Sequence, residues 1–446
     1  MLTEINQLTE NISQLRSSPE WAFKDVERSE TNYITHGYHR YPAKFIPNIV
    51  QKLITKYTKP GDVIVDTFGG CGTTLVEAKI SGRKSFGFDI NPVSKLITQA
   101  KITPLSKRVL AKAEKQFLLS YHNNHPHKCH IDIENTKLLY WFDKQTIAEL
   151  NKIYSSIKTI KNSKAKNFYF CAFSHILKNS SRWLMKSIKP TIDKDKVIPH
   201  PFNIFTKHIY FMTKRNNQFY EKLVNNKCLQ IPTKMYLADS TKKLSLQGNS
   251  VDLVITSPPY VTSYEYADLH QLSLFWFGND KKDFKQWHHY LEEFNIFRKK
   301  FIGTTLRKTQ KKEVFNSFLA ENITNKLSFI NKSLARSVAH YFSDMNKSFI
   351  EIFRFLKLGG KACIIIGNTT LNNVEITNAE VAIEQMQNIG FLPVEFIKRE
   401  ITNKMITPWR DKIDGRFTGL DNPNKKRVYQ YEYILVMEKP TNEITY

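Results

Sequence analysis

The chain has 446 residues, which is enough for one large catalytic domain with insertions or for two domains. Hydrophobic residues make up 41% of it, and this proportion favours a globular protein over a disordered one. Its 66 Lys and Arg residues against 41 Asp and Glu give a net charge of +25, which attracts polyanions such as nucleic acids. A general enrichment of the sequence in Lys would give part of this positive charge even if the protein did not bind nucleic acids.

The cysteines and the apolar runs indicate a cellular compartment. Five cysteines, at 71, 129, 171, 228 and 363, have no paired spacing, which is typical of a reducing cytosol rather than of a disulfide framework. The N-terminus is polar and lacks the apolar core of a signal peptide. No apolar run approaches the roughly 20 residues that span a bilayer. We therefore expect a cytoplasmic protein without a membrane segment.

The first regular pattern lies between Tyr41 and Lys101. Residues 62–66 predict a short buried strand, residues 75–81 a helix, and residues 85–89 a second strand. A glycine-rich turn separates the first strand from the helix. This alternation is typical of a parallel α/β sheet.

Residues 104–230 interrupt that alternation. They are rich in Lys and Asn, contain helical patterns at 141–157 and 168–178, and predict a mostly helical insertion. Strand patterns resume at 234–239 and 251–256.

A polar interval, 278–326, precedes a long amphipathic helix with apolar residues at helical spacing from Tyr341 to Leu356. We expect the glycine pair at 359–360 to end this helix and residues 362–366 to form a buried strand. Residues 391–397 and 431–438 predict a closing pair of strands.

The turn after the first strand has the features of a ligand-binding loop. Asp66 ends the strand, and Gly69, Gly70 and Gly72 follow, so that the backbone can turn sharply and approach a ligand closely. Asp89 ends the next strand, where doubly wound folds place an acid that binds ribose hydroxyls. Dinucleotide enzymes and structural turns use similar glycines, but the full dinucleotide pattern and the Walker lysine are both absent.

The sequence Thr-Ser-Pro-Pro-Tyr at 256–260 is the most informative run in the chain. It follows a strand and therefore lies at the carboxyl end of the sheet, where α/β folds bind ligands. The prolines stiffen the loop, and the hydroxyl of Ser257 with the carbonyl of Pro258 can accept hydrogen bonds from both N–H groups of an aromatic amine. This directs the nitrogen lone pair at a sulfonium methyl group, while Tyr260 offers a flat face to an extruded base. The alternative is an ordinary Pro-Pro turn.

Residues 66–74, Asp89, residues 239–240 and residues 255–260 together resemble the bacterial restriction–modification DNA amino-methyltransferases. That resemblance implies an α/β fold, a Rossmann-like S-adenosylmethionine-dependent methyltransferase sheet, with a large mostly helical insertion. In that family Asp/Asn-Pro-Pro-Tyr occurs mostly in adenine-N6 enzymes and Thr-Ser-Pro-Pro-Tyr/Phe mostly in cytosine-N4 enzymes. The chain has the second form, so the resemblance favours N4-methylcytosine as the product, with adenine N6 as the main alternative.

The resemblance also implies the site residues. The catalytic residues are Ser257, Pro258, Pro259 and Tyr260. The residues that bind S-adenosylmethionine are Tyr41, Phe45, Asp66, Phe68, Gly69, Gly70, Gly72, Thr73, Asp89, Asn91, Asp239 and Ser240, with an aromatic residue of the motif at 39–45 covering the methionine part. Thr67 and Cys71 stand where many relatives carry Pro and Ser, and the interval from Asp89 to Asp239 is much longer than a usual connection.

The patterns along the chain and the family resemblance together predict four parts: an N-terminal helical segment at 1–32, a cofactor-binding half at 33–103, the insertion at 104–230 as a candidate for DNA recognition, and a catalytic half at 231–446 with the Thr-Ser-Pro-Pro-Tyr loop. The expected partner is double-stranded DNA, shared with a cognate restriction endonuclease only through a common site, and the expected state is a monomer. Basic residues predicted to bind DNA phosphates are Arg298, Lys299, Arg307, Lys308, Lys311 and Lys312, although a solvated face would have the same composition.

Other constellations are weaker. His122, His125, His127, Cys129 and His130 lie close together, but they lack fixed ligand spacing and a second half-site, so we predict no metal. Cytosine-C5 chemistry requires a Pro-Cys pair, which is absent. An RNA methyltransferase would more often carry Asn-Pro-Pro. A DNA-binding protein with a decayed enzyme fold conflicts with the intact Asp66, Asp89, Ser257 and Tyr260.

Overall fold

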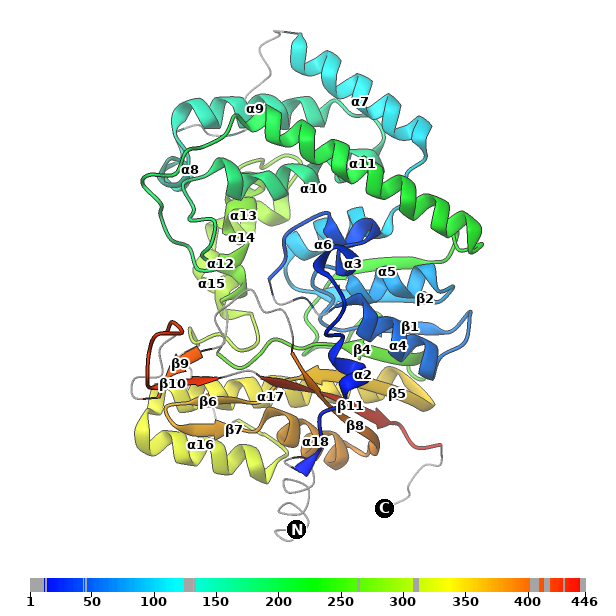
Figure 1. The fold of residues 1–446 in the computed structure, drawn as a ribbon, viewed down its shortest axis with the longest axis vertical. Helices are drawn as coiled ribbons and strands as arrows, with labels where there is room; N and C mark the ends of the chain where they lie inside the picture. Colours follow the sequence, from blue (N-terminus) through cyan, green and yellow to red (C-terminus); the bar gives the residue numbers. More distant parts are fainter. Residues whose placement is uncertain are drawn as a thin grey trace.

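The computed structural model describes residues 12, 14–42, 44, 46–123, 131, 134–262, 265–307, 313–401, 409–412, 418–427 and 430–441. Within these ranges a seven-stranded sheet has the strand order β3-β2-β1-β4-β5-β11-β8. Its strands are β1 (Val63–Asp66), β2 (Lys84–Asp89), β3 (Thr233–Leu237), β4 (Val251–Thr256), β5 (Leu356–Ile366), β8 (Leu392–Glu400) and β11 (Tyr431–Glu438). The sheet occupies the lower half of the molecule in Figure 1.

The strand order reverses between β1 and β4. Strands β3, β2, β1, β4 and β5 are parallel, whereas β11 runs antiparallel to both β5 and β8. From β1 the chain proceeds outward through β2 to β3, and β4 then pairs with the other side of β1. The carboxyl ends of strands at such a reversal are where open α/β sheets bind ligands. The glycine loop follows β1 and the Thr-Ser-Pro-Pro-Tyr loop follows β4, so the topology brings the two predicted motifs to this point.

Alternate strand residues face two different helical layers, as the period of two in a strand requires. Ile64 and Ile365 pack against one layer with α4, whereas Val65 and Ile364 pack against the other with α17. The helices that cover the sheet in this region are α4 (Pro47–Tyr57), α16 (Phe318–Ile330), α17 (Lys332–Phe355) and α18 (Asn378–Ile389). The predicted alternation of buried strands and covering helices is confirmed.

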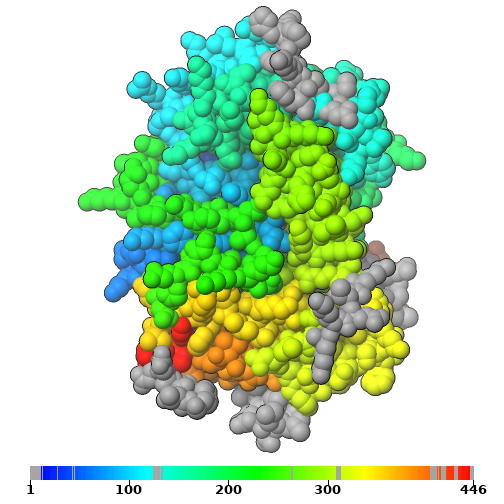
Figure 2. All heavy atoms as spheres, turned by 180° about the vertical axis from the view of Figure 1, so that it is seen from behind, coloured from blue at the N-terminus to red at the C-terminus, as the bar shows by residue number. Residues whose placement is uncertain are grey.

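A second, helical body lies above the sheet in Figure 1. Its helices are α6 (Pro92–Ile102), α7 (Lys107–His122), α8 (Thr136–Trp141), α9 (Lys144–Lys158), α10 (Ser163–Ser180), α11 (Pro201–Asn225), α13 (Gln271–Gly278), α14 (Lys285–Glu292) and α15 (Phe294–Lys299). They share one apolar core, so residues 271–299 pack with the insertion although they follow the Thr-Ser-Pro-Pro-Tyr loop in sequence. Figure 2 shows these yellow-green helices on the surface between the cyan insertion and the yellow α16–α17 region.

The remaining elements are short. They are α2 (Pro19–Ala22), α3 (Arg28–Thr31), the 3₁₀ turn η1 (Ile34–Gly37), α5 (Thr73–Ile80), α12 (Tyr266–Leu269), β6 (Thr369–Leu371), β7 (Val374–Ile376), β9 (Trp409–Asp411) and β10 (Lys425–Arg427). Strands β6 with β7 and β9 with β10 form two small antiparallel pairs. The described ranges contain no helix that is both long and apolar enough to cross a membrane.

Two local predictions were wrong. The helical pattern at 141–157 is divided between α8 and α9, because the Asp143 side chain caps α9 by accepting from the Thr146 amide at 2.7 Å. The glycine pair at 359–360 does not end α17, which stops at Phe355 and passes directly into β5. The glycines instead accommodate an irregularity where the register between β4 and β5 shifts.

Candidate active site

The loop between β1 and α5 requires glycine at defined positions. Gly70 and Gly72 have φ of +46° and +73°, in the left-handed region that side chains disfavour. A Cβ atom on Gly72 would lie 2.5 Å from Cγ2 of Thr98, and one on Gly70 would lie 3.3 Å from Cε1 of Tyr41. The loop therefore fits closely between α6 and the Tyr41 ring, and its last residue, Gly72, is the N-cap of α5.

Asp66 lies beneath this loop and is 1% exposed. Its Oδ1 accepts from the Thr256 hydroxyl at 2.7 Å and from the Phe68 amide at 3.1 Å, and its Oδ2 accepts from the Thr74 hydroxyl at 2.8 Å. Burial raises the pKa of Asp66 to about 6, against the lowering effect of these three donors. The carboxyl group thus holds the glycine loop and the end of β4 together from below.

Asp89 at the end of β2 reaches the rim of the same loop. Its Oδ2 accepts from the Gly70 amide at 3.0 Å and its Oδ1 from the Asn91 amide at 2.8 Å. Burial raises its pKa to about 6. The Ser94 side chain also interacts with this carboxylate, and because a carboxylate offers about four lone-pair sites, acceptor capacity remains for a hydroxyl donor of a ligand. Asn91 caps α6 by accepting from the Val93 amide at 3.0 Å.

Tyr41 and His270 form an aromatic wall beside the glycines. Their ring centroids are 4.9 Å apart at 32°, and the Tyr41 hydroxyl lies 2.9 Å from the Ser94 hydroxyl. His270 Nδ1 lies 3.3 Å from the Asn91 amide nitrogen, and burial lowers the pKa of this histidine to about 4, so the imidazole is neutral at pH 7. Phe45, the second aromatic residue of the predicted cofactor motif, lies outside the described residues.

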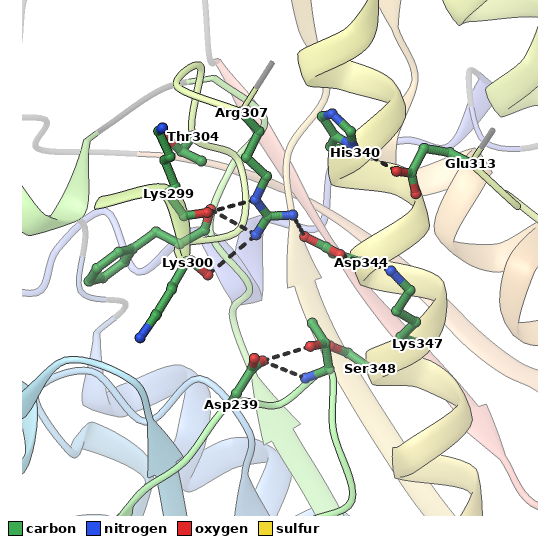
Figure 3. Close-up of polar contacts among 12 residues, drawn as sticks. Asp239, Lys299, Lys300, Thr304, Arg307, Glu313, His340, Asp344, Lys347 and Ser348 are labelled. Atoms are coloured by element: carbon green, nitrogen blue, oxygen red, sulfur yellow. Dashed lines mark hydrogen bonds and ion pairs between the residues drawn. The ribbon is translucent and has the colours of Figure 1, made fainter. Parts of the chain in front are cut away.

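Asp239 and Ser240 follow β3. Asp239 Oδ1 accepts from the amide and the hydroxyl of Thr241, at 3.0 and 2.7 Å, which fixes the turn after the strand. Ser240 is buried, and its hydroxyl lies 3.4 Å from that of Ser348 on α17. Figure 3 shows Asp239 near α17. Ser240 therefore contacts α17, whereas only the Oδ1 atom of the Asp239 carboxylate takes part in the hydrogen bonds of the turn.

In the loop after β4, the side chains of Ser257 and Tyr260 have different surroundings. Ser257 is partly exposed, and its hydroxyl has no hydrogen-bond partner in the part of the chain that the structure describes. The Tyr260 hydroxyl donates to Oε2 of Glu432 on β11 at 3.1 Å, and the other oxygen of Glu432 pairs with Arg399 on β8. Burial beside Glu432 raises the pKa of Tyr260 well above its usual value. The antiparallel edge of the sheet thus orients the Tyr260 ring.

The predicted phosphate-binding residues do not share one environment. Lys299 is exposed, whereas Arg307 donates to the Lys299 carbonyl at 2.7 Å, approaches the Lys300 carbonyl at 3.3 Å and pairs with Asp344 of α17 (Figure 3). Arg298 pairs with Asp268 at 2.7 Å. Lys308, Lys311 and Lys312 lie outside the described residues. Arg307 is therefore occupied in holding its own loop.

No cluster of His, Cys, Asp or Glu with the geometry of a metal site occurs among the described residues. Of the five residues in the sequence cluster at 122–130 the structure describes only His122, whereas His125, His127, Cys129 and His130 lie outside the described residues. Elsewhere, His39, His175, His208 and His270 lie near one another, and burial lowers the pKa of each of them.

Sequence reasoning missed His270, Glu432 and Arg399. No local pattern marks them, because each gains its role from a partner more than 30 positions away in the chain. Thr256 was predicted as part of the motif, but its hydrogen bond to Asp66 followed only from the pairing of β1 with β4.

The strand order, the antiparallel β11, the glycine loop and the acid at the end of β2 define a Rossmann-like methyltransferase. The residues present fit S-adenosylmethionine: Asp89 has acceptor capacity for ribose hydroxyls, and Tyr41 faces Gly70, where a side chain would crowd its ring. The sequence matches the DNA methylase family (N6_N4_Mtase) over residues 4–100 and 251–446. The chain belongs to this family, and it is a DNA methyltransferase that uses S-adenosylmethionine, as the sequence resemblance predicted.

Individual relatives span most of the chain. It is 25% identical over 398 residues to the Type II methyltransferase M.MvaI of Kocuria varians, covering 84% of this chain and 86% of that protein. It is 22% identical over 447 residues to the Type II methyltransferase M.BsoBI of Geobacillus stearothermophilus, covering 87% of each. A solved structure of a putative DNA modification methylase from Thermus thermophilus, complexed with S-adenosyl-L-methionine, is 15% identical, covers 47% of this chain and 56% of that one, and has a TM-score of 0.21. The fold assignment therefore rests on the strand order of the sheet.

Proposed function

We propose that the chain methylates the exocyclic N4 amine of cytosine in double-stranded DNA, as the modification component of a restriction–modification system. The observation that carries the proposal is the Thr-Ser-Pro-Pro-Tyr loop at the end of β4, tied through Thr256 and Asp66 to the glycine loop. The cytosine-N4 form of this motif supports the base, and the Type II relatives over most of the chain support the biological setting.

The residues of the loop divide the work of holding the base. The Ser257 hydroxyl, which lacks a partner in the described structure, and the Pro258 carbonyl accept hydrogen bonds from the two N–H groups of the amine. Pro259 stiffens the loop, and the Tyr260 ring, fixed by Glu432, stacks on the extruded base. When bound, S-adenosylmethionine supplies an electrophilic methyl group. Accepting both N–H bonds directs the amine lone pair away from the ring plane and toward that group.

The cofactor-binding residues have matching roles in the proposal. Asp89 accepts from the ribose, and Tyr41 with Phe68 lines the loop. Gly69, Gly70 and Gly72 let the backbone approach the ligand, and the first turn of α5, beginning at Thr73, presents free amide groups. Asp66 and Asn91 act on the same site by fixing the loop and the start of α6.

The product identifies the function. The chain is expressed in a host without endogenous DNA methylation, and plasmid DNA is digested to nucleosides for mass spectrometry. We expect N4-methylcytosine, at one sequence motif when the same DNA is sequenced for modified bases. N6-methyladenine alone would show that the serine form of the motif acts on adenine, and unmethylated DNA with a folded, cofactor-bound protein would contradict the proposal.

Ser257→Ala gives the matched variant. It should lower turnover by about 10²- to 10³-fold, comparable to removing one preorganised hydrogen bond from a dry site, while cofactor affinity stays unchanged. Ser250→Ala is the control, because Ser250 immediately precedes β4 and its hydroxyl donates only to the nearby Gln247 carbonyl at 2.6 Å. Equal turnover of the two variants would remove Ser257 from the mechanism.

A further inference from the structure

An open cavity of about 460 Å³ lies at the edge of the helical body, between α8 on one side and α12, α13 and α15 on the other. Its walls are Thr136, Lys137, Tyr140 and Trp141 of α8, Pro190, Asp268 of α12, Gln271 and Phe275 of α13, and Phe294 and Arg298 of α15. In Figure 1 these helices lie along one side of the molecule, with α12 and α15 between α8 and the sheet. Helix α12 begins six positions after Tyr260, so the cavity is close in sequence to the catalytic loop.

Aromatic rings form much of the cavity wall. Tyr140 is 60% exposed, although a tyrosine ring has a large apolar face, and it contacts Trp141 edge-on at 5.1 Å between centroids. Phe275 and Phe294 form a second edge-on pair at 5.5 Å. Exposed aromatic faces are suited to stacking on nucleobases, and such stacking does not depend on which base is present.

Cations and an amide accompany these rings. Lys137 Nζ lies 5.5 Å from the Phe275 ring centre, and the Arg298 guanidinium lies 5.8 Å from that of Phe294. Asp268 pairs with Arg298, which leaves Lys137 as the uncompensated charge of the wall. The Nε2 atom of Gln271 and the Nε atom of Arg298 are buried and have no hydrogen-bond partner among the described residues. Two N–H donors without acceptors are costly when buried, and a base edge or a phosphate would supply acceptors.

We propose that this cavity binds a nucleotide of the substrate DNA other than the target base. The Tyr140 and Phe294 rings contact the base, Gln271 reads its edge, and Lys137 neutralises the adjoining phosphate, to which the Nε atom of Arg298 donates a hydrogen bond. Lys299 and Lys300 extend the positive charge beyond the cavity, because they are exposed at the end of α15. The proposal rests on the proposed function, since it names the part of the chain that holds DNA while the target base is at Tyr260.

Binding of DNA tests the proposal with two surface tyrosines. Tyr140→Ala should weaken the binding of a duplex that contains the enzyme's target motif by about 5-fold or more. This factor corresponds to the loss of one base–aromatic contact. Tyr210→Ala is the control, because Tyr210 is 75% exposed on α11 and lies away from the cavity walls. Lys137→Gln should lower the slope of log affinity against log salt by about 0.9. Equal affinity of wild type, Tyr140→Ala and Tyr210→Ala would overturn the proposal.

Cross-linking places the nucleotide directly. The full chain is bound to the same duplex carrying 5-iododeoxyuridine at single positions, irradiated, and digested for mass spectrometry. A cross-link to Tyr140, Trp141 or Phe294 supports the proposal, whereas cross-links confined to the catalytic loop contradict it and leave the methyltransferase function intact. A free deoxynucleoside monophosphate that protects Tyr140 from modification, in a protein whose DNA affinity does not change in Tyr140→Ala, would assign the cavity to a small molecule instead. Cofactor affinity, measured by calorimetry, should be the same in all variants.

Discussion

The hydroxyl of Thr256 donates a hydrogen bond of 2.7 Å to Oδ1 of Asp66, although the two residues are 190 positions apart. Both are 1% exposed, and each ends a strand, β4 and β1, that pairs with the other. The same hydroxyl oxygen accepts from the Phe68 amide at 3.2 Å. The Thr256 side chain therefore connects the glycine loop after β1 to the start of the Thr-Ser-Pro-Pro-Tyr loop after β4.

Removing that hydroxyl should affect both loops. Thr256→Val keeps the size of the side chain but leaves the buried Asp66 carboxyl with one donor fewer, and we expect the free energy of unfolding to fall by about 1–3 kcal/mol. Urea-induced unfolding measures this change, and calorimetry should show weaker S-adenosylmethionine binding. Thr256→Ser retains the donor and should recover most of both quantities. Equal behaviour of the valine and serine variants would mean that the hydrogen bond contributes nothing.

Cofactor binding should depend on pH through Asp89. Burial raises the pKa of this carboxyl to about 6, and the ionised form is the better acceptor for ribose hydroxyls. Affinity for S-adenosylmethionine should therefore rise with pH between about 5 and 7 and level off above the pKa, with release of a proton on binding near pH 6. Calorimetry in two buffers of different ionisation enthalpy measures the proton.

Asp89→Asn is the control for this pH dependence, because Asp66, which has a similar raised pKa, remains in place. The variant should bind the cofactor more weakly and show little change in affinity over the same pH range. A variant that keeps the full pH dependence would assign the titration to Asp66 or to another group.

Much of the sheet could be predicted from the sequence, because its strands are short apolar runs with glycine or acidic residues at their ends. Residues 251–256 were predicted as a strand and form β4, and the closing strands at 391–397 and 431–438 correspond to β8 and β11. The prediction that the glycine pair at 359–360 ends the long helix was wrong, although glycine after a helical pattern is commonly a helix end. Gly360 instead lies where a Cβ atom would be 2.4 Å from Leu356 Cδ2, a close approach that only the folded sheet imposes.

In the candidate site, too, some residues could be predicted from the sequence and others could not. Asp89 and the glycines could be recognised because their roles are local to one strand and one turn. Glu432 could not, because it is an ordinary polar residue of a strand until β11 pairs beside β5 and brings it to the Tyr260 hydroxyl. The shared core of α10 and α13 was also hidden, since apolar residues in two helices do not reveal that they pack together.

Tyr260 should act through its ring more than through its hydroxyl. Tyr260→Phe loses the hydrogen bond to Glu432, but Glu432 keeps its ion pair with Arg399, so the ring should keep its position. We expect DNA affinity near that of the wild type for Tyr260→Phe, and a loss of about 1–3 kcal/mol for Tyr260→Ala, in which stacking on the base is absent. Fluorescence anisotropy with labelled duplex measures both. Equal losses in the two variants would show that the hydroxyl, and not the ring, holds the base.

Arg307 and Lys299 were both predicted to bind DNA phosphates, but their surroundings in the structure predict different effects when each is replaced. Arg307 pairs with Asp344, which is 8% exposed in its side chain, and donates to the Lys299 carbonyl, whereas Lys299 is exposed. Arg307→Gln should lower the free energy of unfolding by about 1.5–3 kcal/mol, because a largely buried carboxylate loses one of its two charged donors and keeps only Lys347, at 3.2 Å. Lys299→Gln should leave urea unfolding unchanged and lower the slope of log DNA affinity against log salt by about 0.9. The double variant Arg307→Gln/Asp344→Asn should recover part of the stability, since the largely buried carboxylate is gone and Lys347, which loses its partner, is half exposed to solvent. If Arg307→Gln instead unfolds like the wild type and lowers the salt slope by the same amount as Lys299→Gln, Arg307 contacts DNA and the ion pair with Asp344 is not maintained in the complex.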